Sequence, residues 1–162
     1  GGQDCASLYP VRGGQRVVLM IRVHILPQIR PIFLFSRPEL KSMVQSVVHA
    51  LGWTIGDLEL LVTSDRDVAG KNQDFLGVPG PTNVLSFPLD MDPVAGLNGS
   101  IVLSAHAVQR ESHLYAQEAG EYCLRMLVHA LLHLAGYEHG PEMEALAELG
   151  IQEALLEMEQ GS

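Results

Sequence analysis

The sequence predicts an α+β domain in which a small mixed sheet of about four strands is flanked by helices. Four short segments rich in β-branched residues indicate the strands, and four or five longer segments with apolar residues at helical spacing indicate the helices. The chain has 162 residues, of which 47% are hydrophobic and 18% charged. This length and composition predict one folded domain over residues 1–162, and they exclude a disordered chain.

The expected strands are short and are separated by segments rich in Gly and Pro. The first, RVVLMIRVHI, ends ahead of two prolines, and TNVLSF stops at Pro88. Residues 1–14 precede the first strand and are expected to be a poorly ordered N-terminal extension. The four strands are predicted at residues 16–25, 57–63, 82–87 and 100–105.

The clearest helix start is the sequence SRPE. Ser36 suits the N-cap, Pro38 suits the first turn, and Glu39 stands three residues after the serine, as in a capping box. Gly52 is expected to end this helix. Further helices are predicted from Asp65 to about Gly70, at about 104–117 and 118–135, and from Pro141 onward.

The chain is acidic, but its charge is uneven. It carries 10 basic and 19 acidic residues and a net charge of −9, which is unlike a non-specific nucleic-acid binder. Residues 1–41 contain six of the basic residues and only two of the acidic ones. If the protein binds a polyanion, the contact is expected in this first part of the chain; the alternative is a solvated surface without a partner.

Two further features predict a soluble cytoplasmic protein that does not enter a membrane. The apolar run from Val17 to Phe35 contains two Arg, one His and two Pro, so it falls short of the ~20 apolar residues of a membrane helix. Cys5 and Cys123 fit no disulfide or CxxC pattern, which favours a reducing compartment. Cys123 is expected to be a small buried residue in a helix.

Three histidines with the spacing HxxxHxxGxxH predict a metal site at the end of a central helix. His129 and His133 are four residues apart on a predicted helix, so their imidazoles lie on one face, one turn apart. Gly136 can adopt a positive φ, end the helix and return His139 to the same point. Three imidazoles with one open position are the coordination of a catalytic zinc site. The other histidines lack such a pattern and are expected to be structural or solvated: His24, His49, His106 and His113.

The same spacing occurs in one class of zinc peptidases, which place a general-base Glu directly after the first His. Here that position is Ala130. Glu138 could in principle substitute, although a carboxylate beside His139 better suits the role of orienting a ligand. The residues therefore favour a metal hydrolase that is not a peptidase of this class.

The segment HALLHLAGYEH resembles the HGxLHLxGYDH signature of the YbeY family, which are bacterial rRNA maturation factors and endoribonucleases. PTNVLSFP at residues 81–88 resembles the second signature of that family, and GSIVLS at 99–104 resembles its GDIVIS strand, with Ser100 in place of Asp. Order and spacing agree from about residue 55 to 158. The resemblance implies a mixed α/β fold, one Zn²⁺ or another divalent metal on the three histidines, and cleavage of single-stranded RNA.

The resemblance also implies a cellular role. The substrate would be small-subunit rRNA, cleaved during maturation and ribosome quality control. Ribosomal proteins or a ribosome-associated GTPase would be the protein partners.

One departure from the family pattern bears on activity. The family has an aromatic residue and an Arg ahead of its TNVLSFP block, whereas this chain keeps Phe75 and has Leu76 in place of the Arg. Leucine cannot hold a phosphate, so either another cation replaces the Arg or the activity is altered. The cations that follow Lys41 are Arg66, Lys71, Arg110 and Arg125.

Three functions follow as hypotheses, of which we favour the first. It is a metal-dependent endoribonuclease in which His129, His133 and His139 act through the metal, and activated water or a 2′-hydroxyl attacks a phosphodiester. Asn83 and Ser86 could contact the substrate, or they satisfy hydrogen bonds within the protein only. The second is a ribosome-associated metal-binding factor with weak or no nuclease activity. The third is a metal hydrolase of another substrate class, such as peptides.

Overall fold

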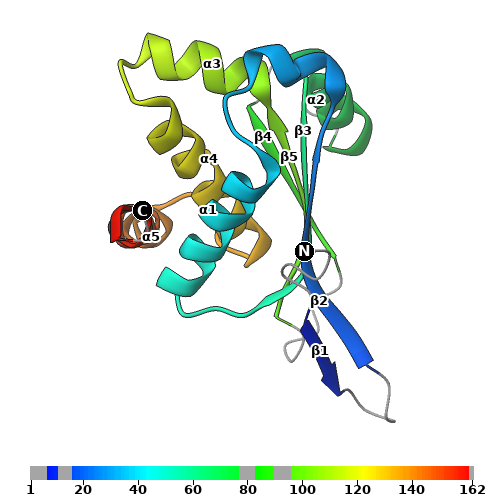
Figure 1. The fold of residues 1–162 in the computed structure, drawn as a ribbon, viewed down its shortest axis with the longest axis vertical. Helices are drawn as coiled ribbons and strands as arrows, with labels where there is room; N and C mark the ends of the chain where they lie inside the picture. Colours follow the sequence, from blue (N-terminus) through cyan, green and yellow to red (C-terminus); the bar gives the residue numbers. More distant parts are fainter. Residues whose placement is uncertain (1–6, 11–15, 77–82, 90–95, 161–162) are drawn as a thin grey trace.

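The computed structural model describes residues 7–10, 16–76, 83–89 and 96–160 (Figure 1). Its centre is a mixed sheet with the strand order β1-β2-β3-β5-β4. β2, β3 and β5 are parallel to one another, whereas β4 is antiparallel to β5. These four strands confirm the predicted sheet. The strands are β1 (Ser7–Pro10), β2 (Arg16–Ile25), β3 (Ile55–Thr63), β4 (Val84–Pro88) and β5 (Leu97–Ser104).

β1 is a fifth strand, which pairs antiparallel with Arg16–Leu19 of β2. The resulting hairpin extends beyond the helices (Figure 1). β1 lies within residues 1–14, the expected N-terminal extension; residues 1–6 and 11–14 of that segment lie outside the described part of the chain.

β5 begins three residues earlier than the sequence pattern suggests. Leu97–Gly99 is poor in strand-forming residues, yet it pairs with β3 across a register irregularity. The Asn98 side chain accepts the backbone N–H of Asp57 at 2.6 Å and so supplies the hydrogen bond that the irregularity would otherwise leave unmade. The start of β5 is therefore determined by its pairing with β3, which the local sequence does not predict.

The helices follow the predicted order. α1 begins with the expected capping box, in which Ser36 Oγ accepts from the N–H of Glu39 and the Glu39 carboxylate accepts from the N–H of Ser36. α1 and α4 pack on the sheet, whereas α5 packs chiefly on α1 and α4. The helices are α1 (Arg37–Ala50), α2 (Asp65–Lys71), α3 (Ala105–Leu114), α4 (Ala119–Leu134) and α5 (Pro141–Gln160), with a short 3₁₀ helix, η2 (Pro27–Ile32), and a short π-helix, η3 (Asn72–Leu76).

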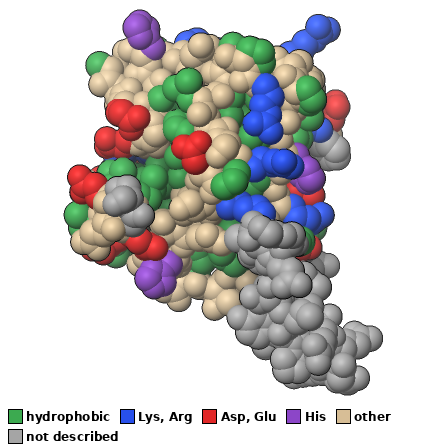
Figure 2. Space-filling view, in the orientation of Figure 1, with side chains coloured by type: hydrophobic (Ala, Val, Ile, Leu, Met, Phe, Trp, Pro, Cys, Tyr) green, Lys and Arg blue, Asp and Glu red, His purple; other side chains and the backbone are tan. Residues whose placement is uncertain are grey.

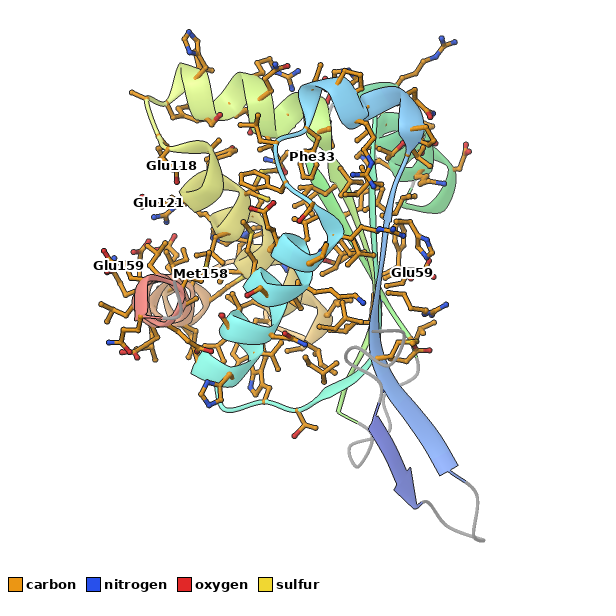
Figure 3. All side chains as sticks on the ribbon, viewed as in Figure 1. Phe33, Glu59, Glu118, Glu121, Met158 and Glu159 are labelled. Carbon is orange, nitrogen blue, oxygen red and sulfur yellow. The ribbon has the colours of Figure 1, made fainter. Side chains whose placement is uncertain are left out.

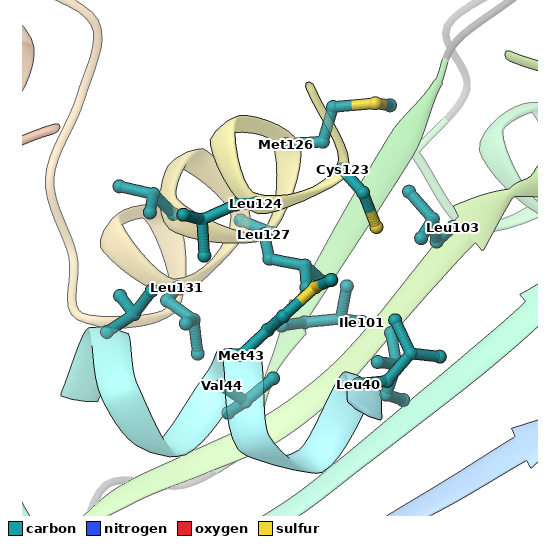
Figure 4. Packing of buried hydrophobic residues seen from close by; sticks show 14 of the residues in the cluster. Leu40, Met43, Val44, Ile101, Leu103, Cys123, Leu124, Met126, Leu127 and Leu131 are labelled. Carbon is teal, nitrogen blue, oxygen red and sulfur yellow. The ribbon is translucent and has the colours of Figure 1, made fainter. Parts of the chain in front are cut away.

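The main core lies between the sheet and the α1–α4 layer. Figure 4 shows apolar side chains of α1 and α4 meeting above β5. Burial of one large apolar side chain stabilises a fold by about 1.5–3 kcal/mol. Cys123 is fully buried there, as predicted, and burial raises the pKa of its thiol to about 12. A smaller cluster of Val68, Leu85 and Val102 places α2 against the other face of the sheet.

Charge is segregated on the surface in the way that the sequence suggests. In Figure 2, Lys and Arg gather on the side of β2, and Asp and Glu gather on the side of α5. A groove of about 580 Å³ between β2 and α1 is lined by Arg22, His24, Arg37 and Lys41. None of the helices in the described part of the chain is long and apolar enough to cross a membrane.

Candidate metal centre

α4 is the helix that carries two of the three candidate ligands. Glu118 caps its start by accepting the N–H groups of Gly120 and Glu121 (Figure 3). Its apolar positions are buried on the sheet and on α1, which leaves His129 and His133 half-buried, one turn apart, on the remaining face.

Gly136 ends this helix and reverses the chain, as the sequence predicts. Its φ is +96°, a conformation that favours glycine. The N–H of Gly136 donates to the carbonyl of His133, and the N–H of Tyr137 donates to that of Leu132, both at 3.0 Å, which is the Schellman pattern. The turn brings His139 next to His133, with ring centroids 4.6 Å apart.

Both helix histidines are held in one tautomer by backbone carbonyls. His129 Nδ1 lies 2.8 Å from the carbonyl oxygen of Arg125, and His133 Nδ1 lies 3.0 Å from that of Tyr137. Because a carbonyl oxygen only accepts, each Nδ1 carries a hydrogen, and in the neutral ring Nε2 is then the nitrogen with the lone pair. Metal-bound histidines are oriented in this way, so these two residues fit a divalent metal such as zinc.

The three histidines are electrostatically coupled, although they are not drawn together into a cage. Burial lowers the pKa of His129, and the charges of Arg125, His133 and His139 lower it further, against the opposing effect of the hydrogen bond to the Arg125 carbonyl. The net lowering favours the neutral form that a metal requires. In the described residues, no three His, Cys, Asp or Glu side chains converge closely enough to hold an ion. The three-histidine centre therefore stays a prediction.

Asn83 and Ser86, the candidate substrate contacts, both bind groups within the protein. Asn83 Nδ2 donates to Glu111 Oε1 at 3.1 Å, and Ser86 Oγ donates to the carbonyl of Ala130 at 2.8 Å. The Ser86 bond joins β4 to α4 next to His129. Each residue therefore has a structural partner, whether or not it also meets a substrate.

No sequence motif predicted the hydrogen bonds that Glu111 makes with Asn83 and Tyr122. Tyr122, at the start of α4, donates its hydroxyl to the same Glu111 oxygen that binds Asn83. Burial raises the pKa of Tyr122, and the Glu111 carboxylate raises it further, so the hydroxyl stays protonated as a donor. Residues 83, 111 and 122 are too far apart in sequence, and too ordinary in type, for spacing to reveal this contact.

Of the cations after Lys41, the structure places Arg125 beside the histidines. Its carbonyl holds His129, and Nη1 of its guanidinium lies 2.7 Å from Glu148 of α5. The Arg125 Nε is buried and has no hydrogen-bond partner within the described part of the chain. The side chains of Phe75 and Leu76, named above for the family's aromatic–Arg pair, lie outside the described residues.

The remaining histidines bear other contacts. His106 accepts the N–H of Asp65 at the start of α2, and His49 lies 3.1 Å from Glu157. His24 lies 3.9 Å from Glu59, and His113 is exposed on α3. Ala130 is fully buried, and Glu138 is exposed.

A mixed sheet covered by a helix that carries HxxxH and ends in a glycine turn defines a class of small α+β proteins with a histidine cluster at a helix end. Within that class, the chain belongs to the endoribonuclease YbeY family, whose model matches residues 34–159.

Individual relatives agree with this assignment. The chain is 37% identical over 141 residues to an endoribonuclease YbeY of Oleidesulfovibrio alaskensis, covering 74% of this chain and 83% of the relative. It is 40% identical over 117 residues to that of Nitratidesulfovibrio vulgaris, covering 61% and 72%. The solution structure of TM1509 from Thermotoga maritima has the same fold, with a TM-score of 0.58, 23% identity, and coverage of 88% of this chain and 93% of that one.

Proposed function

We propose that this protein is a metal-dependent endoribonuclease that cleaves single-stranded RNA, acting in the cytoplasm on small-subunit rRNA during maturation and ribosome quality control. Membership of the endoribonuclease YbeY family supports the reaction class. The observation that supports the metal dependence is the pair of carbonyl bonds that engage Nδ1 of His129 and of His133, so that Nε2 of each ring, on one helix face, is the nitrogen available to a metal.

His129, His133 and His139 would hold one Zn²⁺ or a similar divalent ion. When bound, such an ion supplies Lewis acidity toward a phosphoryl oxygen and toward water. The chain itself orients two of the ligands. The carbonyls of Arg125 and Tyr137 fix the imidazoles of His129 and His133 before a metal binds, so these side chains need little reorganisation on binding.

Arg125 is our candidate for the cation that this chain uses in place of the family's Arg. It lies one turn before His129 on α4, and Glu148 holds its guanidinium from α5. The ion pair with Glu148 fixes the guanidinium in position but offsets part of its charge, so a phosphate would be bound through the N–H donors that Glu148 does not engage. The Arg125→Gln variant is expected to bind zinc normally and to cleave RNA more slowly.

The deciding experiment measures bound zinc and cleavage of a single-stranded RNA on the same samples. Metal-loaded wild type, chelated wild type and His133→Ala are compared, with His113→Ala, an exposed histidine of α3, as the matched control. We expect wild type and His113→Ala to cleave, and chelation or His133→Ala to remove zinc and cleavage together.

Two outcomes would contradict the proposal. If His133→Ala keeps metal-dependent cleavage, the histidine site is not the catalytic one. If wild type holds zinc and leaves RNA intact, a ribosome-associated binding factor replaces the nuclease, and recovery of ribosomal proteins or a GTPase with the protein would then support that function.

A further inference from the structure

Two helices of this fold end in the same motif, and each places an aromatic residue at the same position of it. Gly52, with a φ of +74°, follows α1 as Gly136 follows α4. The N–H of Trp53 donates to the carbonyl of Val48, just as the N–H of Tyr137 donates to that of Leu132. Both are Schellman motifs with the aromatic as the second residue beyond the cap.

The two aromatic rings meet. The centroids of Trp53 and Tyr137 are 6.4 Å apart and the ring planes are inclined by 22°, so the rings are stacked with an offset. Both side chains are only half-buried. Together they form a wall of a pocket of about 390 Å³, which is also lined by Gly52, Thr54, Gly96, Leu97 and Ala135.

The chemistry of this pocket selects an uncharged planar ligand. Its lining, as far as the structure describes it, contains no charged side chain. α1 and α4 both end here, and helix C-termini present carbonyl groups and the negative end of the dipole, which disfavours a phosphate and favours N–H donors. Within the described part of the chain, the indole N–H of Trp53 and the hydroxyls of Thr54 and Tyr137 make no hydrogen bond to protein, so they are open to a ligand.

Tyr137 links the pocket to the candidate metal centre. The ring of that residue lines the pocket, and its carbonyl oxygen accepts the Nδ1–H of His133 at 3.0 Å. A ring that stacks on Tyr137 would therefore lie against the residue whose carbonyl orients one of the candidate metal ligands.

We propose that this pocket is a nucleobase subsite, in which one base of the RNA strand stacks on the Trp53–Tyr137 pair beside the cleaved phosphodiester. That the ligand is RNA rests on the proposed function, whereas the expectation that the pocket binds a base rests on the aromatic pair and the uncharged lining. Aromatic stacking of bases accepts any sequence, because every base has a π-face.

Trp53 is the only tryptophan in the chain, so its fluorescence reports on this pocket alone. Adenosine, a six-nucleotide single-stranded RNA and inorganic phosphate are titrated into the metal-loaded protein. We expect saturable quenching by adenosine and by RNA, and none by phosphate. Tyr137→Leu should weaken adenosine binding about 5- to 150-fold, the range expected for loss of one stacked base, and Tyr137→Phe should restore it.

Tyr115→Leu is the matched control, because Tyr115 is an aromatic residue, 58% exposed, at the end of α3. It should leave adenosine binding unchanged, and far-UV circular dichroism verifies that each variant is folded. Cleavage that continues without any Trp53 quenching by RNA would overturn the subsite and leave the nuclease intact. Quenching by adenosine without cleavage would support the subsite and count against the nuclease. Equal quenching by phosphate would also overturn the subsite.

Discussion

His133 donates its Nδ1–H across the end of its own helix to the carbonyl of Tyr137, 3.0 Å away. The carbonyl lies four residues further along the chain, beyond the last helical turn, and it faces back only because Gly136 is left-handed at φ +96°. A backbone conformation thus fixes the tautomer of a side chain. The glycine of the HxxxHxxGxxH motif therefore has two tasks: it returns His139 to the site, and it orients His133.

The Gly136→Ala variant tests this link. An added Cβ meets no atom within 4 Å, so the expected loss of about 1–2 kcal/mol in unfolding free energy comes from the positive φ alone. Movement of the Tyr137 carbonyl should also weaken zinc binding by about tenfold, as loss of an outer hydrogen bond does. The measurements are urea unfolding and a competitive zinc titration.

Gly52→Ala is a closely matched control. Gly52 has the same Schellman position, a φ of +74° and open space around its Cβ, but it follows α1, and its turn makes no hydrogen bond to a candidate metal ligand within the described part of the chain. It should lose similar stability and keep its zinc affinity. Equal loss of zinc affinity in both variants would show that destabilisation, and not the His133 bond, is responsible.

Ser86→Ala separates the two roles that the sequence left open for this residue. The hydroxyl donates to the carbonyl of Ala130 at 2.8 Å, so we expect a structural role. Its removal should lower the unfolding free energy by about 1 kcal/mol, the worth of one hydrogen bond, and leave kcat on RNA unchanged. Unchanged stability with a large fall in kcat would instead identify Ser86 as a substrate contact.

Gly99 of β5 packs closely against Leu134 at the end of α4 and against the backbone of β4. A Cβ there would lie 2.6 Å from Leu134 Cδ2 and 2.7 Å from the carbonyl oxygen of Phe87, and the φ of +150° already disfavours a side chain. Gly99→Ala should therefore destabilise the protein by about 1–3 kcal/mol in thermal or urea unfolding.

Gly70→Ala, on α2 with open space around it, should stabilise the protein by about 0.5–1 kcal/mol. A loss at Gly70 or a gain at Gly99 would contradict the packing described here.

The features that the sequence predicted depend on local contacts, whereas those that it did not predict depend on contacts between distant parts of the chain. Capping boxes, helix-ending glycines and the HxxxH face depend on neighbours within four residues, so α1, α4 and the Gly136 turn were predictable. The early start of β5 depends on pairing with β3, about forty residues away. The Trp53–Tyr137 stack depends on two helices that end side by side, and the only local signal was an aromatic after glycine at each helix end.

Asp65 joins the start of α2 to α3 through two oxygens. Oδ1 accepts from the Ser104 hydroxyl at 2.5 Å, and Oδ2 accepts from Arg110 Nη1 at 2.6 Å. Burial alone would raise the pKa of Asp65, but these bonds and the charge of Arg110 bring it below its ordinary value of 3.8. A carboxyl with a lowered pKa stabilises the fold at a pH above 3.8, and that contribution is lost as the pH falls through the folded-state pKa.

Arg110→Gln should therefore be destabilising in a pH-dependent way. Both partners of the pair are partly exposed, at 52% and 37%, so the expected loss at pH 7 is up to about 1 kcal/mol. The difference between wild type and variant should shrink below pH 3.8, where Asp65 is protonated in the unfolded chain and then in the folded one. Urea unfolding at a series of pH values measures it, and Arg66→Gln, an exposed residue next to Asp65, is the control and should show little change. A difference for Arg110→Gln that does not vary with pH would mean that its side chain stabilises α3 by packing, not through the charge of Asp65.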